Sequence, residues 1–268
     1  MSYLDELESQ SIYIIREAYY RYKHNLALLW SMGKDSTTLL HLVRKAFFGN
    51  VPIPVIHIDT GFKFRQMYEY RDKYTSKWKL KTIIIKNDKA RKDKISPVSG
   101  KFECCNALKT IALSDSVRRL KLKALMVGIR RDEHSIRAKE RFFSIRDENS
   151  SWNYMNQPAE LWMEYYKTVV NSGAHYRIHP ILAWREIDVW SYIKRERIPV
   201  VSLYFAKSKR RYRSIGCECC CEPVNSSANT INKIIQEIDK SKAGERDGRA
   251  QDKEQEYMMQ KLRSLGYM

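Results

Sequence analysis

The sequence lacks any long uncharged hydrophobic run. No stretch of its 268 residues approaches the roughly 18 apolar residues that a membrane-spanning helix needs. The N-terminal segment, MSYLDELESQSIYIIREAYY, carries acidic residues and has no signal-peptide pattern. We therefore expect a cytoplasmic protein that does not associate with a membrane.

Acidic residues are in the minority. The chain has 31 Asp and Glu against 49 Lys and Arg, which gives a formal net charge of +18. Such an excess favours polyanionic partners, nucleic acid above all, because basic side chains displace counterions from a phosphate backbone. A generally basic soluble surface, or a surface paired with an acidic subunit, would have the same composition. Charge therefore favours nucleic acid as a partner, and these two alternatives stay open.

Cysteine is absent from most of the chain, and its six occurrences fall in two places. Cys104 and Cys105 are adjacent, and SIGCECCCEPV carries the other four, at positions 217, 219, 220 and 221. In a reducing cytoplasm, clusters of this kind suggest a metal site or thiol chemistry more than disulfides.

The hydrophobic pattern alternates between strands and helices. Buried-strand patterns occur at 26–30, 54–61, 81–86, 124–129 and, more briefly, 177–182. Amphipathic helices are expected near the N-terminus, after residue 36, and over 63–78, 104–120, 186–196 and about 231–238. This alternation predicts an α/β fold with a doubly wound, mostly parallel sheet. We expect a nucleotide-binding domain over 1–205 and a helical, cysteine-containing C-terminal segment over 206–268, whose charged end orders over the active site.

The segment SMGKDS, residues 31–36, directly follows the first strand. A strand that turns tightly into a helix presents backbone N–H groups and the positive end of the helix dipole to an anion. Gly33 permits close approach, Ser31 and Ser36 can donate hydroxyl hydrogen bonds, and Lys34 can neutralise phosphate charge. Asp35 can orient the phosphate or help to hold Mg²⁺. An ordinary turn with a capping serine is the alternative interpretation.

This loop resembles the pyrophosphate loop of the N-type ATP pyrophosphatases, which cleave ATP between its α and β phosphates and adenylate a substrate. Four further stretches resemble the small subunit of sulfate adenylyltransferase, within the phosphoadenosine-phosphosulfate reductase superfamily, whose fold is adenine nucleotide alpha hydrolase-like. They are HIDTGFKFRQMYEYRD (57–72), VGIRRDEHSIRAKERFFSIRD (127–147), HPILAWREIDVWSYI (179–193) and GERDGRAQDKE (244–254).

The resemblance implies site residues at the matching positions. ATP would be bound by Ser31, Gly33, Lys34, Asp35, Ser36, Asp59 and Gly128. Lys34, Asp35, Arg130 and Arg131 would act on the reacting phosphates, the two arginines through bidentate bonds. Arg137 and Arg141 are weaker candidates, and we expect Lys139 and Arg146 on a solvated helix face.

The cysteines resemble a different branch, the assimilatory adenylylsulfate reductases, which bind a 4Fe–4S cluster. On that pattern the ligands are Cys104, Cys105, Cys217 and Cys220, since soft thiolates suit iron–sulfur centres. Zinc or purely structural thiols are alternatives. Cys219 and Cys221 remain as alternative ligands, persulfide carriers or inert thiols.

No cysteine follows Cys221, so the C-terminal nucleophile of those reductases is missing. This combination resembles the ATP pyrophosphatases of DNA phosphorothioation, which work with a cysteine desulfurase. The leading hypothesis is therefore adenylation of the DNA backbone for sulfur insertion. The alternative is a sulfate adenylyltransferase small subunit with a GTPase partner subunit; an adenylylsulfate reductase-like enzyme, a tRNA thiolation enzyme and a nucleotide-binding scaffold are further possibilities.

Overall fold

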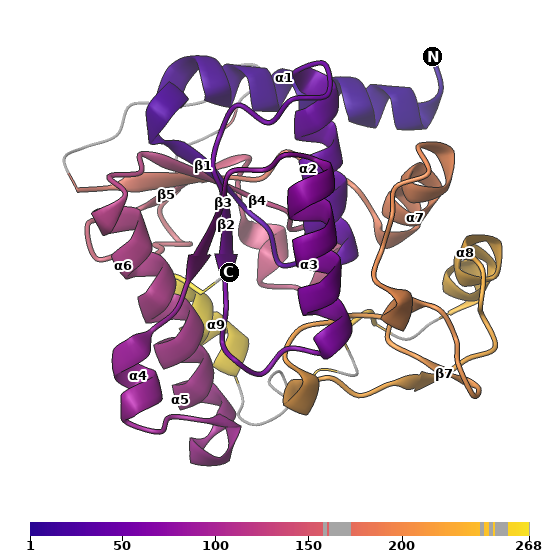
Figure 1. The fold of residues 1–268 in the computed structure, drawn as a ribbon. Helices are drawn as coiled ribbons and strands as arrows, with labels where there is room; N and C mark the ends of the chain where they lie inside the picture. Colours follow the sequence, from indigo (N-terminus) through magenta and orange to yellow (C-terminus); the bar gives the residue numbers. More distant parts are fainter. Residues whose placement is uncertain (158–159, 161–172, 242–243, 247–248, 250–256, 268) are drawn as a thin grey trace.

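The structure is a computed structural model that describes residues 1–157, 160, 173–241, 244–246, 249 and 257–267. Its centre is a sheet flanked by helices on both faces (Figure 1). In the described part of the chain no helix is long and apolar enough to cross a membrane.

The central sheet of the described residues has the strand order β3-β2-β1-β4-β6-β5. The strands are β1 (Leu26–Leu29), β2 (Val55–Ile58), β3 (Thr82–Ile85), β4 (Ala124–Val127), β5 (Phe143–Arg146) and β6 (His175–Ile178). All neighbours pair in parallel except β5, which runs antiparallel to β6 at the edge. The predicted α/β fold with a mostly parallel sheet is confirmed.

Burial explains why β1, β2 and β4 are apolar or nearly so, whereas the equally buried β6 contains His175 and Arg177. Every residue of these four strands is buried, because helices cover both faces of a parallel sheet. The order of strands also reverses at β1, which pairs with β2 on one side and β4 on the other. A crevice forms outside the carboxyl ends of strands at such a reversal, and this is where nucleotide sites lie in doubly wound folds.

The helices occupy two layers. On one side of the strands lie α2 (Lys34–Ala46) and α3 (Arg65–Lys77), with α1 (Tyr3–Tyr22) and α7 (Glu186–Arg195) in contact with α2. On the other lie α4 (Asp88–Lys92), α5 (Lys101–Cys105) and α6 (Ala112–Arg119) (Figure 1). Two layers are what right-handed crossovers give when successive strands are added on opposite sides of a strand reversal.

Several predicted elements differ in detail. The helix expected over 104–120 is α5, a π-helical stretch at Asn106–Ile111, and α6. The strand expected over 177–182 is β6, which ends at Ile178 before a turn. Arg146, expected on a solvated helix face, is instead fully buried in β5 and paired with Glu140 at 2.7 Å. The many basic residues of 130–146 suggested a solvated helix face. A strand was not predicted there because the sequence does not show that Arg146 is buried and paired with Glu140.

The chain beyond residue 205 carries short elements. They are a two-stranded ribbon of β7 (Arg210–Arg211) and β8 (Val224–Asn225), a 3₁₀ turn at Glu218–Cys220, α8 (Ile231–Lys240) and α9 (Met258–Ser264). Helix α8 contacts α7, and α9 contacts α5. The division into domains at residue 205 stays a prediction.

Candidate active site

The SMGKDS loop forms the turn between β1 and α2. Gly33 is the N-cap of α2, and Lys34 is its first residue. The hydroxyls of Ser31 and Ser36 lie 3.0 Å apart, and the Ser31 N–H donates to the Ser36 hydroxyl at 3.2 Å. These bonds close the turn over the start of the helix, where the dipole favours an anion. The loop therefore has the geometry expected of a phosphate site.

Gly128 packs directly beneath this loop. A Cβ atom at position 128 would lie 2.9 Å from the Cα and N atoms of Ser36, closer than real Cβ contacts allow. Glycine is therefore required here because β4 ends against the first turn of α2, not because of an unusual backbone angle. The chain that follows the fourth strand thereby contacts the SMGKDS loop, and the role of Gly128 in nucleotide binding stays a prediction.

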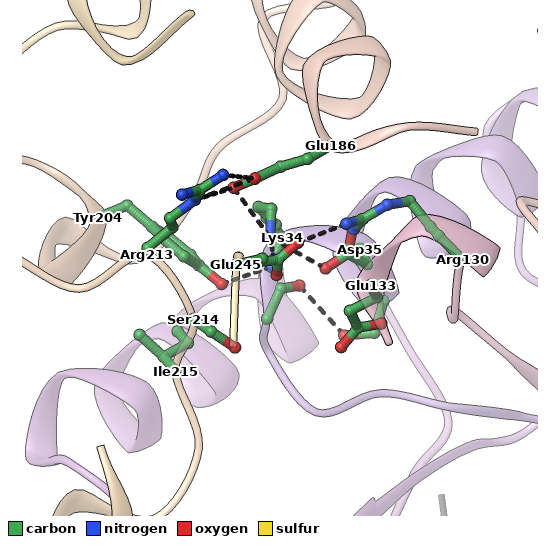
Figure 2. Close-up of polar contacts among 12 residues, drawn as sticks. Lys34, Asp35, Arg130, Glu133, Glu186, Tyr204, Arg213, Ser214, Ile215 and Glu245 are labelled. Carbon is green, nitrogen blue, oxygen red and sulfur yellow. Dashed lines mark hydrogen bonds and ion pairs between the residues drawn. The ribbon is translucent and has the colours of Figure 1, made fainter. Parts of the chain in front are cut away.

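Lys34 and Arg130 converge below the loop on one carboxylate, that of Glu245 (Figure 2). The Lys34 ammonium lies 2.5 Å from Glu245 Oε1 and 3.3 Å from Asp35, while Arg130 bonds both Glu245 and Asp35. Lys34 is 1% exposed and Arg130 0%. The two predicted phosphate-binding cations are thus buried together with internal counter-anions.

Glu245 was not predicted as a site residue, although it belongs to the GERDGR motif. Burial disfavours its charged form, but Arg130 and Lys34 outweigh this and hold the pKa of Glu245 far below its usual value. The same contacts raise the pKa of Arg130 further, against the effect of burial. Glu245 is therefore a buried anion that pairs with both of the cations predicted to bind phosphate.

A second set of contacts supports this centre. The hydroxyl of Tyr204 accepts the backbone N–H of Lys34 at 2.8 Å. Glu186, at the start of α7, lies 3.9 Å from the Lys34 ammonium and forms an ion pair with Arg213 at 2.7 Å (Figure 2). Tyr204 and Glu186 reach Lys34 from more than 150 positions away, and of these residues only Glu186 lies in a stretch that the resemblance marked, HPILAWREIDVWSYI.

A cavity of about 120 Å³ opens beside the loop. Its polar lining comprises Ser31, Asp35, Ser36, Lys63, Lys109, Glu133, Arg137, Tyr204, Ser214, Arg246, Arg249 and Tyr267. Cations outnumber carboxylates in this list, and Lys63, Lys109, Arg246 and Arg249 come from segments outside the phosphate loop. The cavity is therefore suited to an anionic ligand larger than the phosphates that the loop alone would hold.

Four predicted residues do not line this cavity: Lys34 and Arg130, which are buried against Glu245, and Asp59 and Arg131. Asp59 follows β2, as expected, and accepts hydrogen bonds from the Gly61 N–H at 2.9 Å and the Tyr68 hydroxyl at 2.8 Å. The Arg131 guanidinium lies over the Phe142 ring, 5.2 Å from its centroid. Arg130, not its neighbour, is the arginine that the fold directs to the loop.

The two cysteine clusters come together behind the cavity. Cys104 interacts electrostatically with Cys105, Cys217 and Cys219, and burial first, then these thiols, raise its pKa to about 12. Burial also raises the pKa of Cys217, but Lys109 and Lys63 reverse this and lower it to about 7. The Lys109 ammonium lies 3.6 Å from the Cys105 sulfur.

Within the described ranges, no three His, Cys, Asp or Glu side chains are arranged to hold a metal ion. Cys219 is exposed, and Cys221 accepts a hydrogen bond from Arg249 at 2.8 Å. The fold thus brings the four predicted ligand positions into one region, and their role as ligands stays a prediction.

Comparison with known proteins identifies the family. The model of the phosphoadenosine phosphosulfate reductase domain matches residues 25–223. The chain belongs to this family. It is 36% identical to sulfate adenylyltransferase subunit 2 of Photorhabdus laumondii subsp. laumondii, with 100% of this chain and 98% of the relative covered. It is 37% identical to the protein of the same name from Myxococcus xanthus, with 99% and 97% covered.

Solved structures of this reductase-domain fold agree with the architecture. The phosphoadenylyl-sulfate reductase of Candida auris, in a phosphate complex, is 18% identical with a TM-score of 0.56, covering 84% of this chain and 98% of that one. Candida glabrata FMN adenylyltransferase, with FAD and pyrophosphate, is 16% identical with a TM-score of 0.58, covering 82% and 67%. The resemblance to the superfamily is confirmed, and the similar full-length relatives carry the name of the alternative hypothesis rather than that of the leading one.

Proposed function

We propose that this protein is an adenylyltransferase that joins the AMP part of ATP to an oxyanion and releases pyrophosphate, with sulfate as the acceptor. One observation carries the proposal. Lys34 and Arg130 converge under an anion-binding loop at the strand reversal, in a chain similar along its whole length to sulfate adenylyltransferase subunit 2. The DNA phosphorothioation hypothesis takes second place for this reason.

The site has the groups that this transfer requires. An acceptor oxygen attacks the α-phosphorus and forms a new P–O bond, while the bond to the bridging α–β oxygen breaks and pyrophosphate leaves with the electron pair. The N–H groups at the start of α2, together with Lys34 and Arg130, would stabilise the charge on the departing pyrophosphate. Asp35 and Glu245 are carboxylates that suit Mg²⁺, which would neutralise phosphate charge when bound.

The remaining cations of the cavity favour a second anion beside ATP. Lys63, Lys109, Arg246 and Arg249 line it but do not belong to the loop. Sulfate meets this requirement, since a doubly charged tetrahedral anion needs several cationic donors. The word "subunit" in the names of the relatives supports a partner chain, for which we propose the GTPase subunit implied by the sequence resemblance.

The test is pyrophosphate release from ATP, measured with sulfate, duplex DNA, single-stranded DNA or tRNA as the added acceptor, with and without the GTPase subunit. We expect stimulation by sulfate. The variant Lys34→Ala should lower turnover by at least about 100-fold, because it removes a charge that stabilises the leaving group. Lys89→Ala, an exposed lysine on α4, is the matched control. Stimulation by nucleic acid alone would overturn sulfate as the acceptor.

A specific observation keeps nucleic acid as a second candidate. Cys104, Cys105, Cys217 and Lys109 lie together next to the cavity, an arrangement that sulfate activation does not require. A site that inserts sulfur into a DNA backbone would need thiol or cluster chemistry at this place, and a cysteine desulfurase to supply the sulfur. The net charge of +18 agrees with a nucleic acid substrate.

The four buried thiols are of the type that 4Fe–4S clusters use, and the Lys109 ammonium would offset the negative charge of their thiolates, but in this structure they are not arranged around a common metal position. Cys104, Cys105, Cys217 and Cys220 would hold the cluster, and it would supply sulfide or redox chemistry when bound. Iron and acid-labile sulfide, determined after anaerobic purification, test this. We expect about four of each per chain, and Cys104→Ser should lose them while Cys219→Ser keeps them. Absence of iron from the anaerobic protein would remove the cluster and weaken the second candidate.

A further inference from the structure

The last described residue, Tyr267, lines the cavity, and helix α9 precedes it. Helix α9 packs its apolar residues Met258, Met259 and Leu262 against Cys105 of α5. The turn that follows contains Gly266, whose φ of +95° favours glycine. A Cβ atom there would also lie 2.6 Å from the Ser150 carbonyl oxygen. This turn directs Tyr267 inward, where it is 5% exposed and lines the cavity.

A buried arginine fixes the backbone of this turn. Arg177, in the middle of β6, donates to the carbonyl oxygens of Tyr267, at 2.7 Å, and Gly266. Arg177 is 1% exposed, and burial together with Arg146 and Arg263 holds its pKa well below the usual value. Burying a cation whose acceptors here are carbonyl oxygens is costly. Apolar packing of α9 would be enough to attach this segment to the fold. The two hydrogen bonds from Arg177 therefore indicate that the position of the Gly266–Tyr267 backbone itself matters.

The side chain of Tyr267 contacts a cavity-lining cation. Its hydroxyl lies 3.3 Å from the Lys109 ammonium, which is also 5.6 Å from the ring centroid. Lys109 comes from the π-helical stretch between α5 and α6 and is only 7% exposed. The tyrosine hydroxyl and the Cys105 sulfur are both acceptors for this ammonium. These two contacts fix the position of the Lys109 ammonium at the wall of the cavity.

We propose that Tyr267 is a positioning residue for the acceptor anion: it holds Lys109 toward an oxyanion bound in the cavity, and Arg177 holds Tyr267. The phosphate loop and Lys34 belong to β1 and α2, whereas Lys109 and Tyr267 reach the cavity from α5–α6 and the chain end. The two groups therefore serve different ligands, ATP and its acceptor. This inference rests on the proposed function for the identity of the acceptor as sulfate.

The test is a comparison of Tyr267→Phe with Tyr257→Phe, which changes an exposed tyrosine at the N-terminus of α9, the helix that precedes Tyr267. We expect Tyr267→Phe to raise the KM for sulfate about tenfold, the effect of losing a hydrogen bond to a charged group, with the KM for ATP unchanged. Tyr257→Phe should leave both constants unchanged. Arg177→Lys, which keeps the charge but not the two-pronged donor, should shift the sulfate KM in the same direction.

A merely structural role predicts a different pattern. Equal changes in the KM for sulfate and for ATP, or a Tyr267→Phe variant identical to Tyr257→Phe, would overturn the proposal. The melting temperature of each variant shows whether it is folded. Calorimetric titration with sulfate separates this inference from the proposed function. If the wild-type protein binds sulfate but does not turn over, the proposed reaction fails, yet weaker binding by Tyr267→Phe would still support the positioning role. No binding of sulfate to the wild type would overturn it.

Discussion

At the scale of single residues, Glu245 determines the charge next to the SMGKDS loop. Its carboxylate neutralises Lys34 and Arg130, the two cations that we propose bind pyrophosphate. Under the proposed function, ATP therefore competes with this internal anion.

The variant Glu245→Gln should consequently lower the KM for ATP several-fold, because glutamine keeps the shape but not the charge. Steady-state pyrophosphate release at varied ATP measures this, with the exposed Glu222→Gln as the control. A large loss of kcat with an unchanged KM would show instead that the carboxylate takes part in the reaction, for example through Mg²⁺.

The adjacent arginines offer a matched comparison. Arg130 is fully buried and bonds Asp35 and Glu245, whereas Arg131 is half-buried and lies over Phe142. Arg130→Ala should lower turnover by about 100-fold or more, while Arg131→Ala should cost only a few-fold. The rates of pyrophosphate release by the two variants show whether Arg130 alone or both arginines act on the phosphates. Equal losses would restore the sequence prediction that both arginines clamp the reacting phosphates.

At the scale of elements, the local parts of the site were predictable and the long-range parts were not. The strand, turn and helix of residues 26–46 were predictable because their signals are local: an apolar run, then Gly33–Lys34, then apolar residues at helical spacing. Glu245 and Tyr204 reach Lys34, and Tyr267 reaches Lys109, through tertiary packing that no short pattern encodes. For Glu245, the only sequence signal was that its segment, GERDGR, resembles the family. The antiparallel edge strand β5 was missed for a related reason, since its arginine is paired by Glu140 from outside the strand.

Glu140 joins the elements that carry the chain end. Fully buried, it pairs with Arg146 of β5 and with Arg263 of α9. Glu140→Gln would leave two buried guanidinium groups without their common anion, so we expect a loss of about 3–5 kcal/mol in the free energy of unfolding. Urea denaturation measures it, and the exposed Glu148→Gln is the control. A change below about 1 kcal/mol would mean that other groups compensate the arginines.

The sign of a pH effect at this cluster can also be stated. Burial opposes the charged form of Glu140, but Arg146 and Arg263 prevail and depress its pKa far below the value in an unfolded chain. The carboxylate therefore stabilises the fold above its unfolded pKa, near 4 to 5, and this contribution is lost as the pH falls below that range. Glu140→Gln should lack this part of the acid sensitivity, which unfolding curves at pH 7 and pH 4 would reveal.

At the scale of the whole molecule, part of the positive charge is not available to a partner. Arg130, Arg146, Arg177, Arg211 and Arg263 are each at most 1% exposed, and Lys34 is equally buried. The net charge of +18 thus overstates the basic surface, which weakens the composition argument for nucleic acid as a substrate. What remains exposed would still attract DNA, because counterion release depends on surface cations and not on a catalytic site.

These two roles of charge separate in one experiment. We expect the protein to bind duplex DNA at 50 mM salt and to lose at least about tenfold in affinity by 200 mM, as non-specific electrostatic contacts do. Pyrophosphate release, measured at 50 mM salt with the DNA bound, should not rise above the rate without DNA, whereas sulfate should raise it. Binding by fluorescence anisotropy and turnover on the same samples provide both values. DNA that stimulates pyrophosphate release while bound would make the backbone the acceptor, and the cysteines next to the cavity would then be the place to look for the sulfur that it receives.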